Sequence, residues 1–281
     1  MKQAKPDMKI LNSFARFLTE SEHTPATREK YLRDCRRFIV FCAGRPLEKQ
    51  LLLDWREQLL ASHYTVGTVN GMLASVHSLL SFLEREDCRL RPLREQRRIF
   101  RDSRRELDRE EYLRLLSTAR QSGKERLLLV MQTICSTGIR VSELQFVTRE
   151  SLDRRYAQIR CKGKTRLIML PEALCRKLRQ YAYRHQVRSG SIFVTRNGRP
   201  LDRSNIWREM KQLCLAAGVL PSKVFPRNLR HLFARSFYQL DRDLSKLADV
   251  LGYSSLETTR IYIMESSQNH ERLLGRLNLL L

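Results

Sequence analysis

The sequence has little that would place it in a membrane or cross-link it. No stretch approaches the roughly 20 consecutive apolar residues that a membrane-spanning helix needs. Residues 1–6 are basic, without the apolar segment of a secretory signal behind them. The seven cysteines are scattered and form no C-x-x-C pair, so we expect neither a disulfide framework nor a zinc site. These absences predict a protein of the reducing cytoplasm with no membrane partner.

Acidic residues are also scarce beside basic ones. The chain has 30 Asp and Glu against 53 Lys and Arg, a formal net charge of +23 and a pI near 10.3. Lysine and arginine release counterions when they meet phosphates, so such a surface favours DNA or RNA as the partner. A basic protein that binds anionic membranes, or one that is only highly soluble, has the same composition. Charge alone therefore leaves these alternatives open.

Apolar periodicity divides the chain into two blocks. The 281 residues, of which 42% are hydrophobic, suffice for one large or two ordinary domains. From about residue 8 to residue 87, apolar residues recur at helical spacing without strand alternation. Thr24 followed by Pro25 is typical of a helix start. We predict a helical domain over residues 1–88.

Residues 89–105 are rich in arginine and lack a clear period. Such a run is either a solvated linker or a basic segment that lies along a DNA backbone. In residues 106–281, Asp108 can cap a helix, and the segment 159–170 is typical of two short strands around a Lys-Gly-Lys turn. Residues 192–194 are a further strand or turn. The predicted fold is mainly α, with a small β-hairpin in a second, α+β domain.

Two arginine-bearing segments of the second block precede a tyrosine near its end. They are residues 137–144, TGIRVSEL, and residues 227–231, RNLRH, and the tyrosine lies in residues 258–263, TTRIYI. A phenolic oxygen served by several fixed cations is suited to attack a phosphodiester, whose transition state carries extra negative charge. The order and spacing of these segments predict an enzyme that breaks and rejoins DNA.

Together with the Lys-Gly hairpin and residues 251–255, LGYSS, these segments resemble the tyrosine recombinase (phage integrase) family. The resemblance runs over nearly the whole chain. It implies a helical, SAM-like core-binding domain over residues 1–88, a basic linker over 89–105, and a catalytic domain with a C-terminal tail helix over 106–281. The length is similar to that of two-domain, Xer-like recombinases and mobile-element integrases, so we expect no arm-binding domain of the lambda type.

The resemblance assigns catalytic roles to individual residues. Arg140 and Arg230 would hold the scissile phosphate, and each guanidinium can contact two of its oxygens. Tyr262 would be the nucleophile, leaving a 3′-phosphotyrosyl bond and a free 5′-hydroxyl. Lys162 would protonate the leaving 5′-oxygen. The hairpin is one residue shorter than the commoner form, so Lys164 remains a rival.

Glu143 follows Arg140 at i+3, where it can brace that arginine. Because arginines supply the positive charge and the sequence has no carboxylate cluster suited to Mg²⁺, we expect neither a metal nor another cofactor. The covalent link to tyrosine would keep the energy of the cleaved phosphodiester bond, so rejoining would not need ATP either.

Two positions depart from the family pattern. Arg227 stands where the family has a histidine, and arginine cannot exchange a proton near neutral pH. Tyr253 stands where the family has histidine or tryptophan, and it can donate one hydrogen bond to a phosphate oxygen. His231 lies about 100° around a helix from Arg230, so we interpret it as a packing residue. The chain is thus an active variant, a slow enzyme, or a mutated form arrested around cleavage.

These features predict a site-specific DNA recombinase, from a mobile element or a resolvase-like relative, that acts as a homo-tetramer on two DNA duplexes. An accessory DNA-bending or excision factor is a further candidate partner. One alternative is a type IB topoisomerase-like nicking-closing enzyme, which would cleave and rejoin DNA by the same chemistry without bringing two DNA sites together. The other is a DNA-binding regulator descended from a recombinase, which Arg227 and Tyr253 favour slightly and the other catalytic residues oppose.

The leucine-rich end of the chain, residues 272–281, is either a helix docked on its own domain or a tail inserted into a neighbouring protomer. We expect the second. Deletion from about residue 268 onward should then abolish cooperative assembly of two DNA sites and leave binding to a single site intact, as measured by gel mobility shift. Unchanged assembly would count against insertion of the tail.

Overall fold

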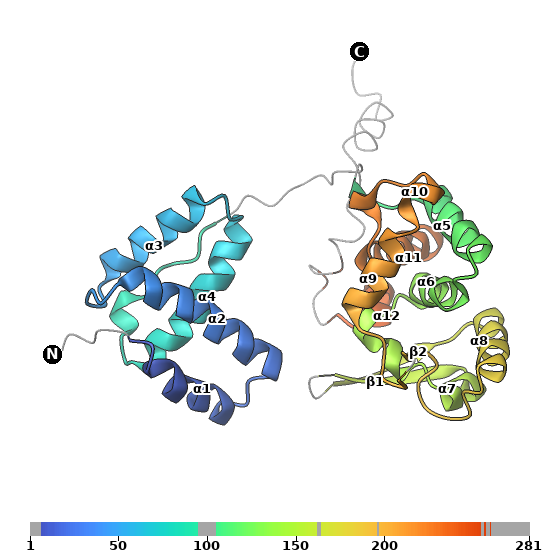
Figure 1. Cartoon of the computed structure of the whole chain (residues 1–281), viewed down its shortest axis with the longest axis horizontal. Helices are drawn as coiled ribbons and strands as arrows, with labels where there is room; N and C mark the ends of the chain where they lie inside the picture. Colours follow the sequence, from blue (N-terminus) through green and yellow to red (C-terminus); the bar gives the residue numbers. More distant parts are fainter. Residues whose placement is uncertain are drawn as a thin grey trace, which may run out of the picture. The chain divides into compact units, whose positions relative to one another are not determined.

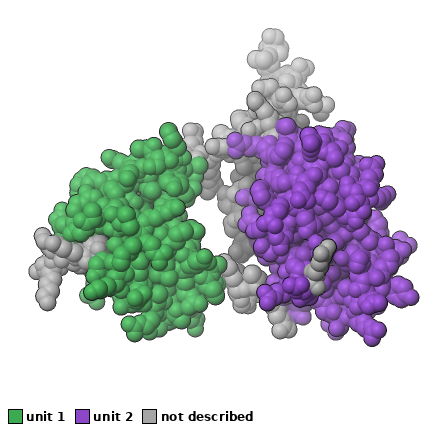
Figure 2. All heavy atoms as spheres, in the orientation of Figure 1, with its two compact units in different colours: residues 1–97 green, residues 98–281 purple. Residues whose placement is uncertain are grey.

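The chain divides into two compact units. The computed structural model describes residues 7–94, 105–161, 164–195, 197–253, 256 and 259. Unit 1 spans residues 1–97 and unit 2 spans residues 98–281 (Figure 2). The division falls inside the arginine-rich segment, of which residues 95–104 lie outside the described residues. The role of that segment as a linker or a DNA contact stays a prediction.

Unit 1 is built from helices around one apolar core, which confirms the predicted helical character (Figure 1). Phe38 packs against Trp55 with ring centroids 5.0 Å apart. The Thr24 side chain accepts a hydrogen bond from the backbone N–H of Thr27, and Pro25 is the first helical residue, so the predicted start of the second helix is confirmed. The elements are α1 (Ile10–Glu20), α2 (Pro25–Cys42), α3 (Lys49–Ala61), α4 (Val66–Phe82) and the short 3-10 helix η1 (Glu86–Cys88).

The beginning of the arginine-rich segment is folded onto unit 1. The side chain of Asn70, on α4, hydrogen-bonds both the backbone N–H and the backbone C=O of Leu93, each at 2.9 Å. Leu90 is buried in the core of the same unit. Residues 89–94 are therefore part of the folded unit.

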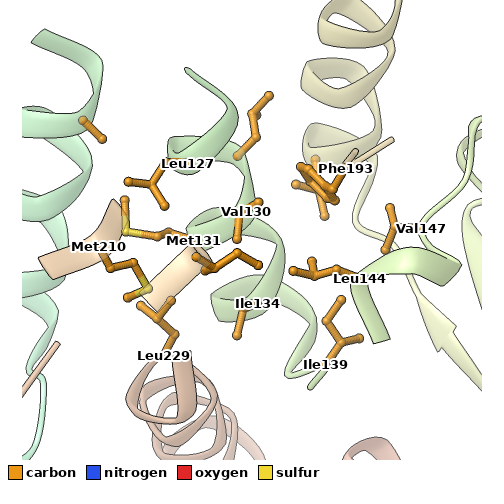
Figure 3. Packing of buried hydrophobic residues seen from close by; sticks show 14 of the residues in the cluster. Leu127, Val130, Met131, Ile134, Ile139, Leu144, Val147, Phe193, Met210 and Leu229 are labelled. Carbon is orange, nitrogen blue, oxygen red and sulfur yellow. The ribbon is translucent and has the colours of Figure 1, made fainter. Parts of the chain in front are cut away.

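In unit 2, helix α6 (Glu125–Thr137) contacts α5, α8, α9 and α11 and contributes to the centre of the core. Figure 3 shows Leu127, Val130, Met131 and Ile134 of α6 among side chains from the surrounding elements. Asp108 caps α5 and forms a reciprocal capping box with Glu111, as its position predicts. Unit 2 also contains, among its described residues, α5 (Arg109–Gln121), η3 (Val141–Phe146), α7 (Arg149–Arg154), α8 (Glu172–Arg184), α9 (Arg203–Lys211), α10 (Cys214–Ala217), η4 (Pro221–Lys223), α11 (Pro226–Asp241) and α12 (Leu244–Leu251).

One antiparallel hairpin forms the sheet of the described residues, which confirms the predicted fold class. Strand β1 (Tyr156–Cys161) pairs with β2 (Lys164–Met169), with Tyr156 opposite Met169 and Cys161 opposite Lys164. The hairpin begins three residues earlier than the sequence pattern predicts, because Tyr156 to Gln158 also pair. The segment 192–194 forms no strand there, only an isolated bridge between Val194 and Pro200.

Gly138 closes α6 in the left-handed conformation, with φ of +66°, and its backbone leads to Arg140. A Cβ at Gly138 would lie 2.4 Å from a ring carbon of Phe233, whereas a Cβ at Gly123, also with φ of +66°, would meet nothing within 4 Å. Gly123→Ala should therefore destabilise unit 2 by about 1–2 kcal/mol through the backbone alone. Gly138→Ala should cost about 1–3 kcal/mol more through overpacking.

Urea unfolding of both variants measures this difference, with Gly123→Ala as the matched control for the backbone conformation. Equal midpoints for the two variants would show that the contact with Phe233 does not constrain this turn.

Candidate active site

Arg140 stands where α6 gives way to η3. Ile139 is fully buried and anchors the turn, and Arg140 has an extended backbone as the N-cap of η3. Its side chain remains 38% exposed. The guanidinium is thus fixed at its base by the core and open to solvent at its end, as an anion-binding group must be.

Glu143 braces Arg140 as the i+3 spacing predicts. One of its carboxylate oxygens accepts from the Arg140 backbone N–H at 2.7 Å, and the other accepts from Arg140 Nη1 at 2.8 Å. The Glu143 side chain is only 4% exposed. Burial lowers the pKa of Arg140, but the hydrogen bond and charge of Glu143 outweigh this and raise it above its ordinary value. Arg140 therefore stays charged.

Arg166 on β2 is a second cation on the same carboxylate. Its Nη2 donates to Glu143 at 2.6 Å, and its Nη1 donates to the backbone carbonyl of Val250 at 2.8 Å, at the end of α12. Burial lowers the pKa of Arg166, the charge of Glu143 opposes this shift, and the charges of Arg230 and Arg140 add to it. Two guanidiniums thus share the Glu143 carboxylate, and the charge of a third, Arg230, acts on Arg166.

Sequence reasoning missed Arg166, although a signal was present. Arg166 lies two residues before Ile168 on β2 and opposite Ile159 on β1, and both isoleucines are buried. Because side chains of a strand alternate between its faces, Arg166 shares the core-facing side. An arginine on the buried face of a hairpin needs a charged or carbonyl partner, and it could have been recognised on that ground.

Arg230 lies on α11 and is only 3% exposed. Its Nη1 donates to the Gly138 carbonyl, and its Nη2 donates to the Leu251 carbonyl at 2.8 Å. Its buried Nε has no hydrogen-bond partner among the described residues. These partners are dipoles and not anions, so they orient the guanidinium without neutralising its charge.

Tyr253 follows the left-handed Gly252 that ends α12. The guanidinium carbons of Arg140 and Arg230 each lie 5.1 Å from the centroid of its ring, within the distance of a cation–π contact. A hydrogen bond also joins the Tyr253 and Arg140 side chains. The structure thus brings three of the predicted site residues together, from segments far apart in the sequence.

Arg227 and His231 pair along one face of α11. The Nε of Arg227 donates to Nε2 of His231 at 3.2 Å, at the i, i+4 spacing of a helix. His231 is buried. The interpretation of His231 as a packing residue omitted this contact, because it considered only the angle from Arg230. Arg227, one turn earlier on α11, is a partner of His231.

The side chains of three further predicted residues are not placed relative to this site. Tyr262 and Lys162 lie outside the described residues. Lys164 begins β2 and pairs with Cys161 at the closed end of the hairpin. Their roles, and the choice between the two lysines, stay predictions.

The described residues contain neither a metal-binding cluster nor a membrane-spanning helix. Within them, no group of three or more His, Cys, Asp or Glu side chains could hold a metal ion. Nor does that part of the chain contain a helix long and apolar enough to cross a membrane.

Comparisons with known proteins identify the family of the chain. A model of the phage integrase family matches residues 105–269. The tyrosine recombinase XerC of Mesorhizobium japonicum is 30% identical over 294 residues, covering 92% of this chain and 92% of that protein. The tyrosine recombinase XerA of Thermococcus kodakarensis is 28% identical over 262 residues, covering 90% of this chain and 89% of that protein.

The fold is similar to that of a lambda integrase dimer bound to a COC′ core site, with a TM-score of 0.73 at 16% identity. That match covers 93% of this chain and 78% of the other. The chain therefore belongs to the phage integrase family of tyrosine recombinases, which act in site-specific DNA recombination.

Glu143 should contribute strongly to the stability of unit 2. Glu143→Gln keeps one acceptor oxygen but turns an NH₂ group toward one of the two guanidiniums, so we expect a loss of about 3 kcal/mol, typical of breaking a buried ion pair. Urea unfolding measures it. Glu209→Gln is the control, because Glu209 also pairs with an arginine, Arg126, at 3.0 Å but is 32% exposed. That change should cost less than about 1 kcal/mol, and equal losses would contradict the prediction.

Proposed function

We propose that the chain is a site-specific recombinase or integrase of a mobile element that cleaves and rejoins DNA through a 3′-phosphotyrosyl intermediate. The observation that supports this most directly is the meeting of Arg140 and Arg230 at Tyr253. Two guanidiniums that face one aromatic ring, one of them held by two backbone carbonyls, form a site suited to one phosphate group.

The arginines would act mainly on the transition state. Attack on a phosphodiester gives a pentacoordinate phosphorus with more negative charge on its oxygens than the substrate has. Fixed cations in a partly buried site stabilise such charge without reorganising. Arg140 and Arg230 meet this requirement because Glu143 and the backbone carbonyls hold them before DNA arrives.

Tyr262 and a hairpin lysine would carry the chemical step. The phenolic oxygen of Tyr262 forms a bond to phosphorus, the bond from phosphorus to the 5′-oxygen breaks, and Lys162 gives a proton to that oxygen. Lys164 remains the alternative donor. Rejoining is the reverse, in which a 5′-hydroxyl attacks the phosphotyrosine and the lysine recovers the proton.

Arg227 would contribute charge and not proton transfer. Its Nε donates to His231, while its terminal nitrogens can donate to a phosphate oxygen or stabilise the phenolate of Tyr262. Tyr253 would hold Arg140 and Arg230 against its ring and donate a hydrogen bond to the phosphate. A site with this composition supports cleavage at a lower rate than one with an imidazole at position 227.

Duplex DNA would be held by unit 1 as the core-binding domain and by unit 2 as the catalytic domain. Four protomers would join two duplexes, with the C-terminal tail connecting them and with an accessory DNA-bending or excision factor as a further partner. A DNA substrate fits action in the cytoplasm. The net charge of +23 supports a large electrostatic share of the binding.

The test is covalent trapping on nicked suicide DNA taken from the ends of the element. The unaltered chain should form a protein–DNA adduct, Tyr262→Phe should form none, and Arg227→His should raise the rate by ~10-fold or more, because a general acid–base group contributes ~10²- to 10⁴-fold. Denaturing gels that follow the adduct with time give the rates.

The remaining outcomes separate the alternatives. Tight DNA binding without an adduct from either the unaltered chain or Arg227→His would favour a regulator that has lost catalysis. An adduct that forms and closes on a single site, with no exchange between two sites, would favour a topoisomerase-like enzyme.

A further inference from the structure

Arg166 connects three elements whose relative positions matter for the proposed reaction. It lies on β2, two residues after Lys164, in the hairpin that carries both candidate general acids. One end of its guanidinium donates to Glu143, which holds Arg140, and the other donates to the carbonyl of Val250 at the end of α12. One side chain thus spans the hairpin, the first arginine and the helix that precedes the nucleophile segment.

The end of α12 is shaped around this side chain. A Cβ at Gly252 would lie 2.5 Å from Cδ of Arg166 and 2.8 Å from its Nε. Gly252 also has φ of +68°, a conformation that favours glycine. Both the space and the backbone at this turn therefore require glycine, and the close approach of Arg166 follows from that.

The chemistry of the contacts requires arginine. The C-terminal carbonyls of a helix carry partial negative charge, which favours a cation there. A guanidinium reaches a carboxylate and a carbonyl with two separate nitrogens, whereas a lysine ammonium is a single point charge. Arg166 stands near two like charges, Arg140 and Arg230, so its position is favourable only because Glu143 and the helix end offset that repulsion.

We propose that Arg166 is a positioning residue for DNA cleavage, which sets Arg140 through Glu143 and ties the end of α12 to the hairpin. This inference rests on the proposed function. Arg166 itself touches neither the phosphate nor the leaving group. Its loss displaces groups that do, and a displacement of about 1 Å in a reacting geometry can lower a rate ~10²-fold.

The first test separates cleavage from binding. Arg166→Met keeps the length of the aliphatic stem and removes both hydrogen bonds, whereas Arg166→Lys can keep one of them. At saturating nicked DNA and at a temperature well below every unfolding midpoint, Arg166→Met should form adduct ~10- to 100-fold more slowly than the unaltered chain, the usual effect of losing a supporting contact. Arg166→Lys should fall between the two, and the Kd for DNA should change less than about 2-fold.

Arg155→Met is the matched control. Arg155 precedes β1 in the same unit and pairs with Glu172 at 3.4 Å, but its side chain is 62% exposed. Its loss should change neither the rate nor the Kd. A rate for Arg166→Met equal to that of Arg155→Met would overturn the inference.

A double variant tests whether Arg166 acts through Glu143. If it does, Glu143→Gln combined with Arg166→Met should cleave no more slowly than the worse single variant, because both changes release the same arginine. If the fold-loss in rate of the double variant equalled the product of the two single-variant losses, the two residues would act independently, which would contradict this route.

Hydrogen exchange supplies a readout that does not depend on activity. Arg166→Met should raise deuterium uptake both in residues 138–146 and in residues 247–253, and Arg155→Met in neither. If the unaltered chain forms no adduct but this paired change is seen, the proposed function fails while the coupling through Arg166 stands. Unchanged uptake in both segments would reject the coupling whatever the activity.

Discussion

The buried carboxylate of Glu143 is the constraint on which the candidate site depends. A carboxylate with almost no exposure is strongly unfavourable unless it is paired and hydrogen-bonded, and here two guanidiniums and one backbone N–H satisfy it. The reverse also holds, because Arg166 is mostly buried and needs that carboxylate. Each group makes the burial of the others tolerable. Residues 140–143, strand β2 and the end of α12 are thereby fixed to one another.

A second consequence concerns the charge that remains. Glu143 supplies one negative charge for the two guanidiniums that it binds, and Arg230 is oriented by two carbonyls that carry no net charge. The site is therefore preorganised and electropositive before any substrate binds. Repulsion among the guanidiniums destabilises the free protein, and an anion bound at the site would relieve that repulsion. The cost of bringing the positive charges together is therefore met in the folding of the protein and not at the moment of reaction.

Local rules account for much of what the sequence revealed. Helical periodicity, the Thr24 and Asp108 caps and the brace from Glu143 to Arg140 each depend on neighbours within four residues, and the structure contains all of them. The Lys-Gly hairpin followed from turn chemistry, although its strands extend further back than the alternation indicated.

What escaped prediction depends on contacts between distant segments. Arg166 reaches Val250 and Glu143 across the fold, and no local pattern encodes either partner. The meeting of two guanidiniums at Tyr253 likewise needs α6, α11 and α12 to be packed together. The resemblance to a family supplied the identity of Arg140, Arg230 and Tyr253, but the physical reason for their convergence becomes visible only in three dimensions.

The contact between Arg227 and His231 bears on the proposed activation of Tyr262. Nε of Arg227 donates to Nε2 of the buried His231, so one nitrogen of that imidazole is engaged by a cation. Arg227 itself cannot act as a base near neutral pH. Under the proposed function, deprotonation of Tyr262 would therefore rely on cations that stabilise the phenolate and not on a base at position 227. Glu143 holds one of those cations, Arg140, in place.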